Sequence, residues 1–274
     1  MGRRTVFFVS DQTGVTAETM GHSLLVQFEG QEFRPVTLPF VSTPDKAAEA
    51  VQRIDATARE EGMRPIVFST LVEDDIRAIV RGANGLFLDF FDAFLGPLEN
   101  ELKVLSAHAS GRAHGVTDLV AYATRINATN FALANDDGSG ARDYAHADVI
   151  LVGVSRSGKT PTCLYMALQY GIFAANYPLA DEDLESDALP KVLQPHRRKL
   201  YGLTIEPERL QQIRHERRPD GRYASAQQVH YEVRQALALF ERHGIPHIDS
   251  TTCSIEEISS RILDRLNLER RVRP

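Results

Sequence analysis

The feature that most constrains the fold is a glycine-rich loop in the middle of the chain. Residues 153–160 read Gly-Val-Ser-Arg-Ser-Gly-Lys-Thr, which matches the phosphate-loop pattern G-x-x-x-x-G-K-[ST] at every position. The preceding residues 148–152, Asp-Val-Ile-Leu-Val, predict a short buried strand. After the loop, Pro161 sits where a first-turn proline is tolerated, and apolar residues recur at helical spacing. Strand, loop and helix together predict an α/β domain that binds a nucleotide phosphate.

Every residue of this loop is a candidate for phosphate binding. In such loops the backbone N–H groups wrap a polyphosphate, the lysine reaches the outer phosphates, and the hydroxyl after it coordinates Mg²⁺. Here those side chains are Lys159 and Thr160. The candidate nucleotide-binding residues are Gly153, Val154, Ser155, Arg156, Ser157, Gly158, Lys159 and Thr160.

Composition argues against several other classes of protein. The chain has 274 residues, 43% of them hydrophobic, and its net charge is −6, which does not indicate a nucleic-acid-binding protein. No apolar run is long enough to span a bilayer, and residues 1–4 lead directly into a strand-like segment rather than a signal peptide. Cys163 and Cys253 form no metal or redox pattern, and Cys163 reads as a small buried residue. We expect a cytoplasmic protein that binds neither nucleic acid nor a membrane.

The first hundred residues alternate between strand and helix patterns. Apolar runs predict strands at 5–9, 36–41, 65–68 and 86–91. A helix follows Thr43-Pro44 and ends before Gly62, and a second carries Val72, Ile76, Ile79 and Val80. Such alternation predicts a doubly wound parallel sheet covered by helices on both faces.

The chain divides into two domains. Residues 105–116 are polar, short in side chains and without periodicity, which places a boundary there. We assign residues 1–110 to an N-terminal α/β domain and residues 111–274 to a kinase-like α/β domain that contains the phosphate loop. No internal repeat is visible in the sequence.

The phosphate loop alone leaves the chemistry open. The chain has no Asn/Thr-Lys-x-Asp motif of the kind that reads guanine, and 118–274 is the size of a kinase-type domain. A module that binds a nucleotide without transferring phosphate remains an alternative. For transfer, Asp136 and Asp137 are the best candidates to orient an acceptor, because they are adjacent carboxylates on a loop shortly before the strand. The alternative is a solvated turn in which Asp caps backbone N–H groups.

Arginines cluster between two predicted helices, and guanidinium groups suit phosphate recognition. Arg214 and Arg218 are the candidates, on the expectation that they lie on a loop. The alternative is a solvated helix face.

The segment 9–18 is the second unusual feature. A strand ends, hydroxyl and acidic residues follow, a glycine permits a tight turn, and a helix begins. Helix N-termini at the carboxyl edge of a sheet bind anions. Asp11, Thr13, Gly14 and Thr16 are therefore candidates for phosphate or substrate recognition, and the alternative is an ordinary turn in which Thr or Asp caps the helix.

Taken together, these segments resemble the phosphoenolpyruvate synthase regulatory proteins, a family of bifunctional serine/threonine kinases and pyrophosphorylases. The resemblance covers nearly the whole chain, and Ser-Arg-x-Gly-Lys-Thr-Pro is far more specific than a general phosphate loop. The stretches that carry it are 9–18, 136–138, 153–161, 175–179, 202–205 and 254–257. One departure is Asn135, where the family pattern has His, and this argues against an acid–base role at that position.

The resemblance implies two opposed reactions. The kinase takes its phosphoryl group from ADP and places it on a threonine of phosphoenolpyruvate synthase (pyruvate, water dikinase), which inactivates that enzyme. The reverse activity uses inorganic phosphate to remove the group and releases pyrophosphate. The resemblance also suggests a homodimer. Lys159, Thr160 and Mg²⁺ would neutralise charge in either direction, and a single phosphate loop makes one shared site the simpler expectation. A small-molecule kinase or ATPase of phosphate-loop type, with no protein substrate, is the alternative.

Overall fold

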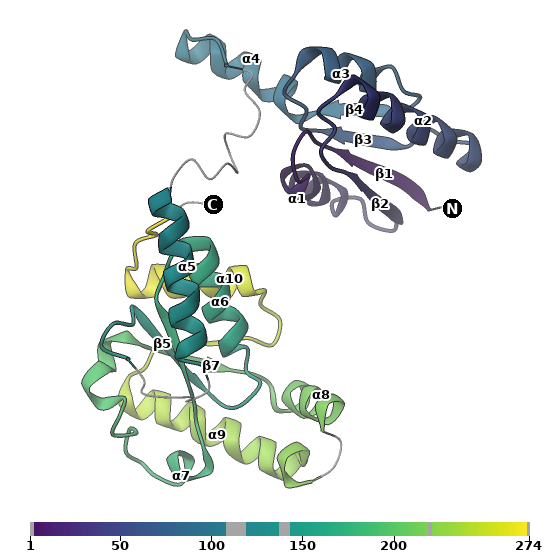
Figure 1. The fold of residues 1–274 in the computed structure, drawn as a ribbon. Helices are drawn as coiled ribbons and strands as arrows, with labels where there is room; N and C mark the ends of the chain where they lie inside the picture. The colour runs from purple at the N-terminus through teal and green to yellow at the C-terminus, as the bar shows by residue number, and fades with distance from the viewer. Residues whose placement is uncertain (1–2, 108–118, 137–142, 219–220, 273–274) are drawn as a thin grey trace. The chain divides into compact units, whose positions relative to one another are not determined.

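The computed structural model describes residues 3–107, 119–136, 143–218 and 221–272. It divides into two compact units, Met1–Thr117 and Asp118–Pro274, drawn in Figure 1. They are called the N-terminal and C-terminal units and are described separately below. The domain boundary expected between residues 110 and 111 lies outside the described residues.

The N-terminal unit is built on a parallel sheet. Its described strands are hydrogen-bonded in the order β2-β1-β3-β4, and every pair is parallel. Strands and helices alternate along the chain, as the sequence predicts. The elements are β1 (Arg4–Val9), α1 (Val15–Leu25), β2 (Phe33–Leu38), α2 (Pro44–Glu61), β3 (Ile66–Ser69), α3 (Asp74–Arg81), β4 (Leu86–Asp89) and α4 (Phe90–Leu102).

Helices cover both faces of this sheet because side chains alternate along each strand. On β1, Phe7 and Val9 pack with buried residues of α2 and α3. Val6 and Phe8, which point to the other face, pack with residues of α1 and with Phe90 at the start of α4. The doubly wound arrangement is therefore confirmed for this unit.

The predicted strand 86–91 is too long. β4 ends at Asp89, and Phe90 and Phe91 belong to α4. The Asp89 carboxylate accepts hydrogen bonds from the N–H groups of Phe91 and Asp92, so it caps the helix. Aromatic residues favour strands in general, but here a local cap decides where the strand stops.

The C-terminal unit contains a second parallel sheet. Its described strands are ordered β6-β5-β7-β8, again with every pair parallel. The elements are α5 (Leu119–Ala134), β5 (Val149–Gly153), α6 (Lys159–Tyr170), β6 (Ala174–Pro178), α7 (Asp181–Leu184), the 3-10 helix η1 (Gln194–Lys199), β7 (Leu200–Thr204), α8 (Pro207–Arg217), the 3-10 helix η2 (Arg222–Ala224), α9 (Ala226–His243), β8 (His247–Asp249) and α10 (Ile255–Leu266).

This sheet too has helices on both faces. Ile150 and Val152 pack in one core with Phe240 of α9, whereas Leu151 packs in another with Met166 of α6. Figure 1 shows α5, α6 and α10 on one side of the strands and α9 on the other. The predicted α/β fold class is confirmed in both units. Among the described residues, no helix is both long and apolar enough to cross a membrane.

The two sheets share one connectivity. In each unit the first strand lies between the second and the third, and the fourth is added beyond the third. The sequence shows no repeat, yet the topology repeats. Each first strand is therefore followed by a loop at the point where the chain reverses its direction across the sheet, which is where open α/β sheets bind ligands.

Candidate phosphate-binding site

The phosphate loop joins β5 to α6 at that reversal point. It surrounds a cavity of about 190 Å³ lined by Ser155, Arg156, Gly158, Lys159, Thr160 and Pro161. The N–H groups of the first turn of α6 have no partner within the helix, and the helix dipole favours negative charge at the same place. Position and polarity therefore both suit a bound anion.

The two glycines of the loop serve different purposes. A Cβ on Gly153 would lie 2.4 Å from the Leu203 carbonyl oxygen, so this glycine is required by the close approach of β7. Gly158 has φ 90° and open space where a Cβ would stand, so it is required by its left-handed backbone conformation. Arg156 is also left-handed, with φ 75°. Left-handed residues within a turn set successive N–H groups around one concavity.

Three of the loop carbonyls accept hydrogen bonds from residues outside the loop. The Gly153 carbonyl accepts from the Leu179 N–H at 3.1 Å, and the Ser157 carbonyl accepts from the Ser250 hydroxyl at 3.1 Å. The Ser155 carbonyl accepts from the Arg214 guanidinium at 3.1 Å. Because these carbonyls are engaged elsewhere, the N–H side of the loop is the side presented to a ligand.

Lys159 belongs to this concavity. Only 4% of its surface is exposed, and its ammonium donates to the Val154 carbonyl at 2.8 Å. A buried ammonium needs such partners, and a phosphate that enters the loop brings oxygens of greater negative charge to the same place.

Asp136 lies beside the hydroxyl of the loop. The Thr160 hydroxyl donates to its carboxylate at 2.7 Å, and the Asn176 amide donates to the same carboxylate oxygen. The Asn176 amide also lies 3.3 Å from the Thr160 oxygen. The sequence names Asp136 as a candidate to orient an acceptor, and these contacts place its carboxylate beside the Thr160 hydroxyl. Asp137 lies outside the described residues.

Asn176 is a site residue that the sequence analysis missed. It lies on β6, is 1% exposed, and its side chain reaches both Thr160 and Asp136. An amide in the middle of the buried strand Ala-Ala-Asn-Tyr-Pro is the signal that identifies it, because buried polar groups need partners.

The oxygens of Thr160 and Asp136 suit Mg²⁺. Among the described residues, no group of three or more His, Cys, Asp or Glu side chains could hold a metal ion by itself. Mg²⁺ in phosphate-transfer sites uses one or two protein oxygens and takes its other ligands from phosphate and water. The pair therefore fits a metal ion that arrives with a phosphate.

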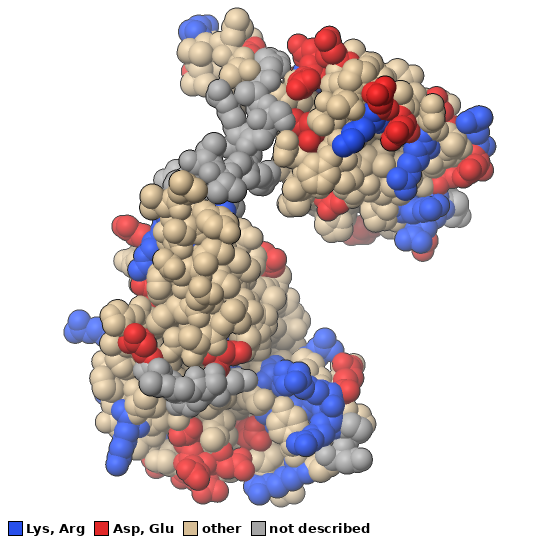
Figure 2. All heavy atoms as spheres, in the orientation of Figure 1, with Lys and Arg blue, Asp and Glu red and all other residues tan. Residues whose placement is uncertain are grey.

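The two candidate arginines lie in different surroundings. Arg214 does not lie on a loop as expected: it belongs to α8, its side chain is fully buried, and it pairs with Glu232 at 2.6 Å. Arg218 directly follows α8 and is exposed. Figure 2 shows Lys and Arg side chains gathered over α8, with an acidic group over α7. Arg218 is thus exposed directly after the basic last turn of α8, whereas the buried Arg214 contacts the Ser155 carbonyl of the loop.

The N-terminal candidates lie in the other unit, after β1. Gly14, with φ 85°, is the N-cap of α1, and no side chain caps this helix. The alternative in which Thr or Asp caps it is therefore wrong. Asp11 is buried, whereas Thr13 and Thr16 are exposed. The structure brings these residues together in one turn of the N-terminal unit.

Cys163 lies below the loop, on α6, and takes no part in this chemistry. Its thiol donates to the Ala175 carbonyl at 3.4 Å. Burial, followed by the charge of Asp136, raises the pKa of the Cys163 thiol far above its usual value. The thiol stays protonated and packs as a small apolar group, as the sequence predicts.

Comparison with known proteins agrees with this geometry. The family model described as kinase/pyrophosphorylase matches residues 6–263. A candidate phosphoenolpyruvate synthase regulatory protein of Alcanivorax borkumensis is 53% identical over 270 residues, covering 98% of this chain and 99% of its own length. Similarly named proteins of Pseudomonas putida and Halorhodospira halophila are each 54% identical, and each alignment covers 98% of this chain and at least 98% of the relative. With the phosphate loop complete and the similarity extending over the full length, this chain belongs to the kinase/pyrophosphorylase family.

Proposed function

We propose that the protein phosphorylates a threonine of phosphoenolpyruvate synthase with ADP as the donor, and removes that group with inorganic phosphate. Transfer of the β-phosphoryl group from ADP to the threonine hydroxyl yields phosphothreonine, AMP and a proton. In the reverse activity, inorganic phosphate attacks the phosphothreonine, restores the threonine and leaves as pyrophosphate. Family membership and the names of the relatives support this pair of reactions.

The observation that carries the proposal is the loop with its buried lysine and its hydroxyl–carboxylate pair. The loop N–H groups would hold two linked phosphates, which are present in ADP and also in pyrophosphate. Lys159 would neutralise charge on the outer phosphate, where the bond breaks or forms. One cavity can therefore serve both directions.

Thr160 and Asp136 would hold the metal side of the site. The Thr160 hydroxyl gives its hydrogen to Asp136 and accepts from the Asn176 amide, which leaves its oxygen one further lone pair for a cation. Asn176 fixes the carboxylate in that position. Mg²⁺, when bound, supplies positive charge that stabilises the transferring phosphoryl group. Orientation of the acceptor threonine is assigned to Asp136 or Asp137, the two adjacent carboxylates named from the sequence.

The N-terminal turn and the exposed arginine complete the proposal. Asp11, Thr13, Gly14 and Thr16 are assigned to recognition of the partner or of phosphate, and Arg218 to phosphate recognition. The homodimer remains a prediction, which sedimentation equilibrium would test.

The test is phosphoryl transfer from β-labelled ADP to purified phosphoenolpyruvate synthase that carries a phosphorylated catalytic histidine. Parallel reactions use γ-labelled ATP or omit the synthase. Label on a synthase threonine from ADP, released as pyrophosphate when phosphate is added, is the expected result. Turnover of ATP without the synthase, and no transfer from ADP, would contradict the proposal and favour a small-molecule kinase or ATPase.

A further inference from the structure

A buried arginine, Arg214, is hydrogen-bonded to the backbone of the phosphate loop. The guanidinium of Arg214 donates to the Ser155 carbonyl at 3.1 Å, to the Tyr223 carbonyl at 3.0 Å and to the Glu232 carboxylate at 2.6 Å. The Arg214 side chain is fully buried, and that of Glu232 is 10% exposed. A buried ion pair is weak evidence for stability, because desolvation offsets much of the attraction. The pair does, however, hold the Arg214 guanidinium in one fixed orientation.

The contact with Ser155 acts on the strained part of the loop. The Ser155 carbonyl and the Arg156 N–H belong to the same planar peptide group, so they point in opposite directions. When Arg214 fixes the carbonyl outward, it directs the Arg156 N–H toward the concavity. Arg156 has φ 75°, a conformation that a non-glycine residue keeps only where its surroundings enforce it.

Tyr223 makes a second contact with Ser155. Its hydroxyl lies 3.0 Å from the Ser155 hydroxyl, and the Arg214 guanidinium stacks over its ring at 4.3 Å from the centroid. Ser155 is thus held through its side chain and its backbone by two groups that contact each other. The two groups come from η2 and α8, so contacts distant in sequence set the shape of the loop.

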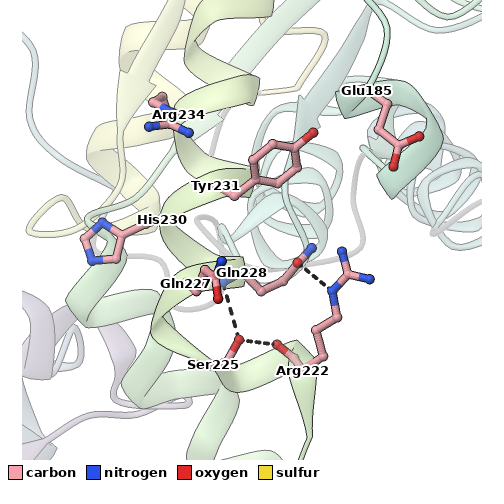
Figure 3. Close-up of a pocket in the computed structure, with 8 residues that line it drawn as sticks. All are labelled: Glu185, Arg222, Ser225, Gln227, Gln228, His230, Tyr231 and Arg234. Carbon is pink, nitrogen blue, oxygen red and sulfur yellow. Dashed lines mark hydrogen bonds between the residues drawn. The ribbon is translucent and has the colours of Figure 1, made fainter.

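The outer end of this network reaches the surface. The Gln228 amide donates to Glu232 at 3.0 Å, and Arg222 donates to the Gln228 oxygen at 2.8 Å. Figure 3 shows Arg222 and Gln228 joined at the side of a cleft of about 630 Å³, with Tyr231 of α9 beside it. The carboxylate that orients Arg214 is therefore itself oriented from the cleft side.

We infer that Arg214 is a positioning residue of the phosphate loop: it holds the Ser155–Arg156 peptide so that the loop binds a diphosphate, and Glu232 holds Arg214 in place. The inference rests on the proposed function in one respect, that the loop binds a diphosphate. It assigns Arg214 no contact with the substrate.

The test replaces Arg214 with Lys, which keeps the charge but cannot reach three acceptors as a planar fork does. Arg77→Lys is the matched control: Arg77 is 5% exposed, lies on α3 in the N-terminal unit and pairs with Asp74 and Asp92. The measurements are calorimetric affinity for pyrophosphate with Mg²⁺, and amide hydrogen exchange without ligand at Ser157, whose N–H donates to the Val154 carbonyl at 3.3 Å. For R214K we expect about tenfold weaker affinity and about tenfold faster exchange, the size of one lost charge-assisted hydrogen bond.

R77K should leave both quantities unchanged although it too removes a buried fork. Unchanged affinity and exchange in folded R214K would overturn the inference, as would equal losses in R77K. If R214K does not fold, Glu232→Gln keeps the shape of the side chain and removes its charge. It should accelerate exchange at Ser157, and no acceleration would overturn the inference. A wild-type protein that binds neither ADP nor pyrophosphate would instead refute the proposed function, and exchange at Ser157 would still test the role of Arg214.

Discussion

The two units place a loop at the same point of the same topology, yet the loops differ in chemistry. β1 and β5 each lie between the second and third strands of their sheets. Each is followed by a helix whose N-cap is a left-handed glycine without a side-chain cap, Gly14 with φ 85° in one unit and Gly158 with φ 90° in the other. The backbone thus offers two similar helix N-termini.

The side chains of the two loops differ in charge. The loop of the C-terminal unit carries Arg156 and Lys159, whereas residues 10–14 of the N-terminal unit, Ser-Asp-Gln-Thr-Gly, include no basic residue and bury Asp11. An ammonium attracts a polyphosphate, whereas the N-terminal turn offers phosphate only its backbone N–H groups and hydroxyls. The comparison teaches that topology supplies the location, and that a few side chains decide whether a polyphosphate is bound.

The largest effect is expected at Lys159. Lys159→Ala should lower the rate of phosphoryl transfer by about a thousandfold, because the charge on the outer phosphate loses its partner in a buried site. The matched control is Lys46→Ala, since Lys46 in the N-terminal unit also donates to a loop carbonyl, that of Phe40. Transfer of label from ADP measures both. If K46A lost as much activity as K159A, the contrast between the two loops would be refuted.

Asn176→Ala tests whether the loop of the C-terminal unit binds Mg²⁺ through Thr160 and Asp136. Removing the amide frees Asp136 from its fixed position, and such supporting contacts are worth about 10- to 100-fold in metal affinity. The concentration of Mg²⁺ that gives half-maximal transfer should rise accordingly, while the maximal rate at saturating Mg²⁺ falls less. Equal loss at all Mg²⁺ concentrations would show that Asn176 does not act through the metal.

The two capping glycines allow a direct test of the shared backbone. Gly14→Ala and Gly158→Ala should each lower the free energy of unfolding by about 1–2 kcal/mol, because both require a left-handed conformation. Gly14→Ala should cost more, since its Cβ would meet Thr37 at 2.8 Å whereas that of residue 158 meets nothing. Urea denaturation measures stability, and ADP titration should show a loss of affinity in G158A only. A loss of ADP affinity in G14A would mean that the first loop takes part in binding.

The smallest effect is expected at Cys163. Because burial raises the pKa of this thiol, it stays protonated as the pH rises through 7 to 9 and should not react with a thiol reagent in the folded protein. Cys253, which is partly exposed, should react. Cys163→Ala should change transfer less than about twofold, because a small apolar residue replaces another. Rapid labelling of Cys163 would show that the helix below the loop opens readily.

Local patterns predicted the fold well. The strand, loop and helix around residues 153–160 were readable because one motif specifies all three, and alternating elements indicated the parallel sheet of the N-terminal unit. The end of β4 was missed because Phe90 and Phe91 favour a strand until the Asp89 cap is considered. The repeated topology was not readable at all, since strand order depends on packing rather than on local pattern.

The contacts of the candidate site could be predicted only between residues close in sequence. Asp136 was named as a candidate, but its contact with Thr160 spans 24 positions and could not be read. Arg214 was chosen for its charge and assigned to a loop, because its contact with Ser155 spans 59 positions. Long-range contacts of this kind give a residue its role without leaving a local pattern.

The bond between Lys159 and the Val154 carbonyl gives the site a built-in competitor. A ligand must offer the ammonium more than a neutral carbonyl does, so a singly charged, well-hydrated anion such as chloride gains little by entering, whereas a polyphosphate gains much. An anion must therefore carry more negative charge than a backbone carbonyl before Lys159 gains by changing partner.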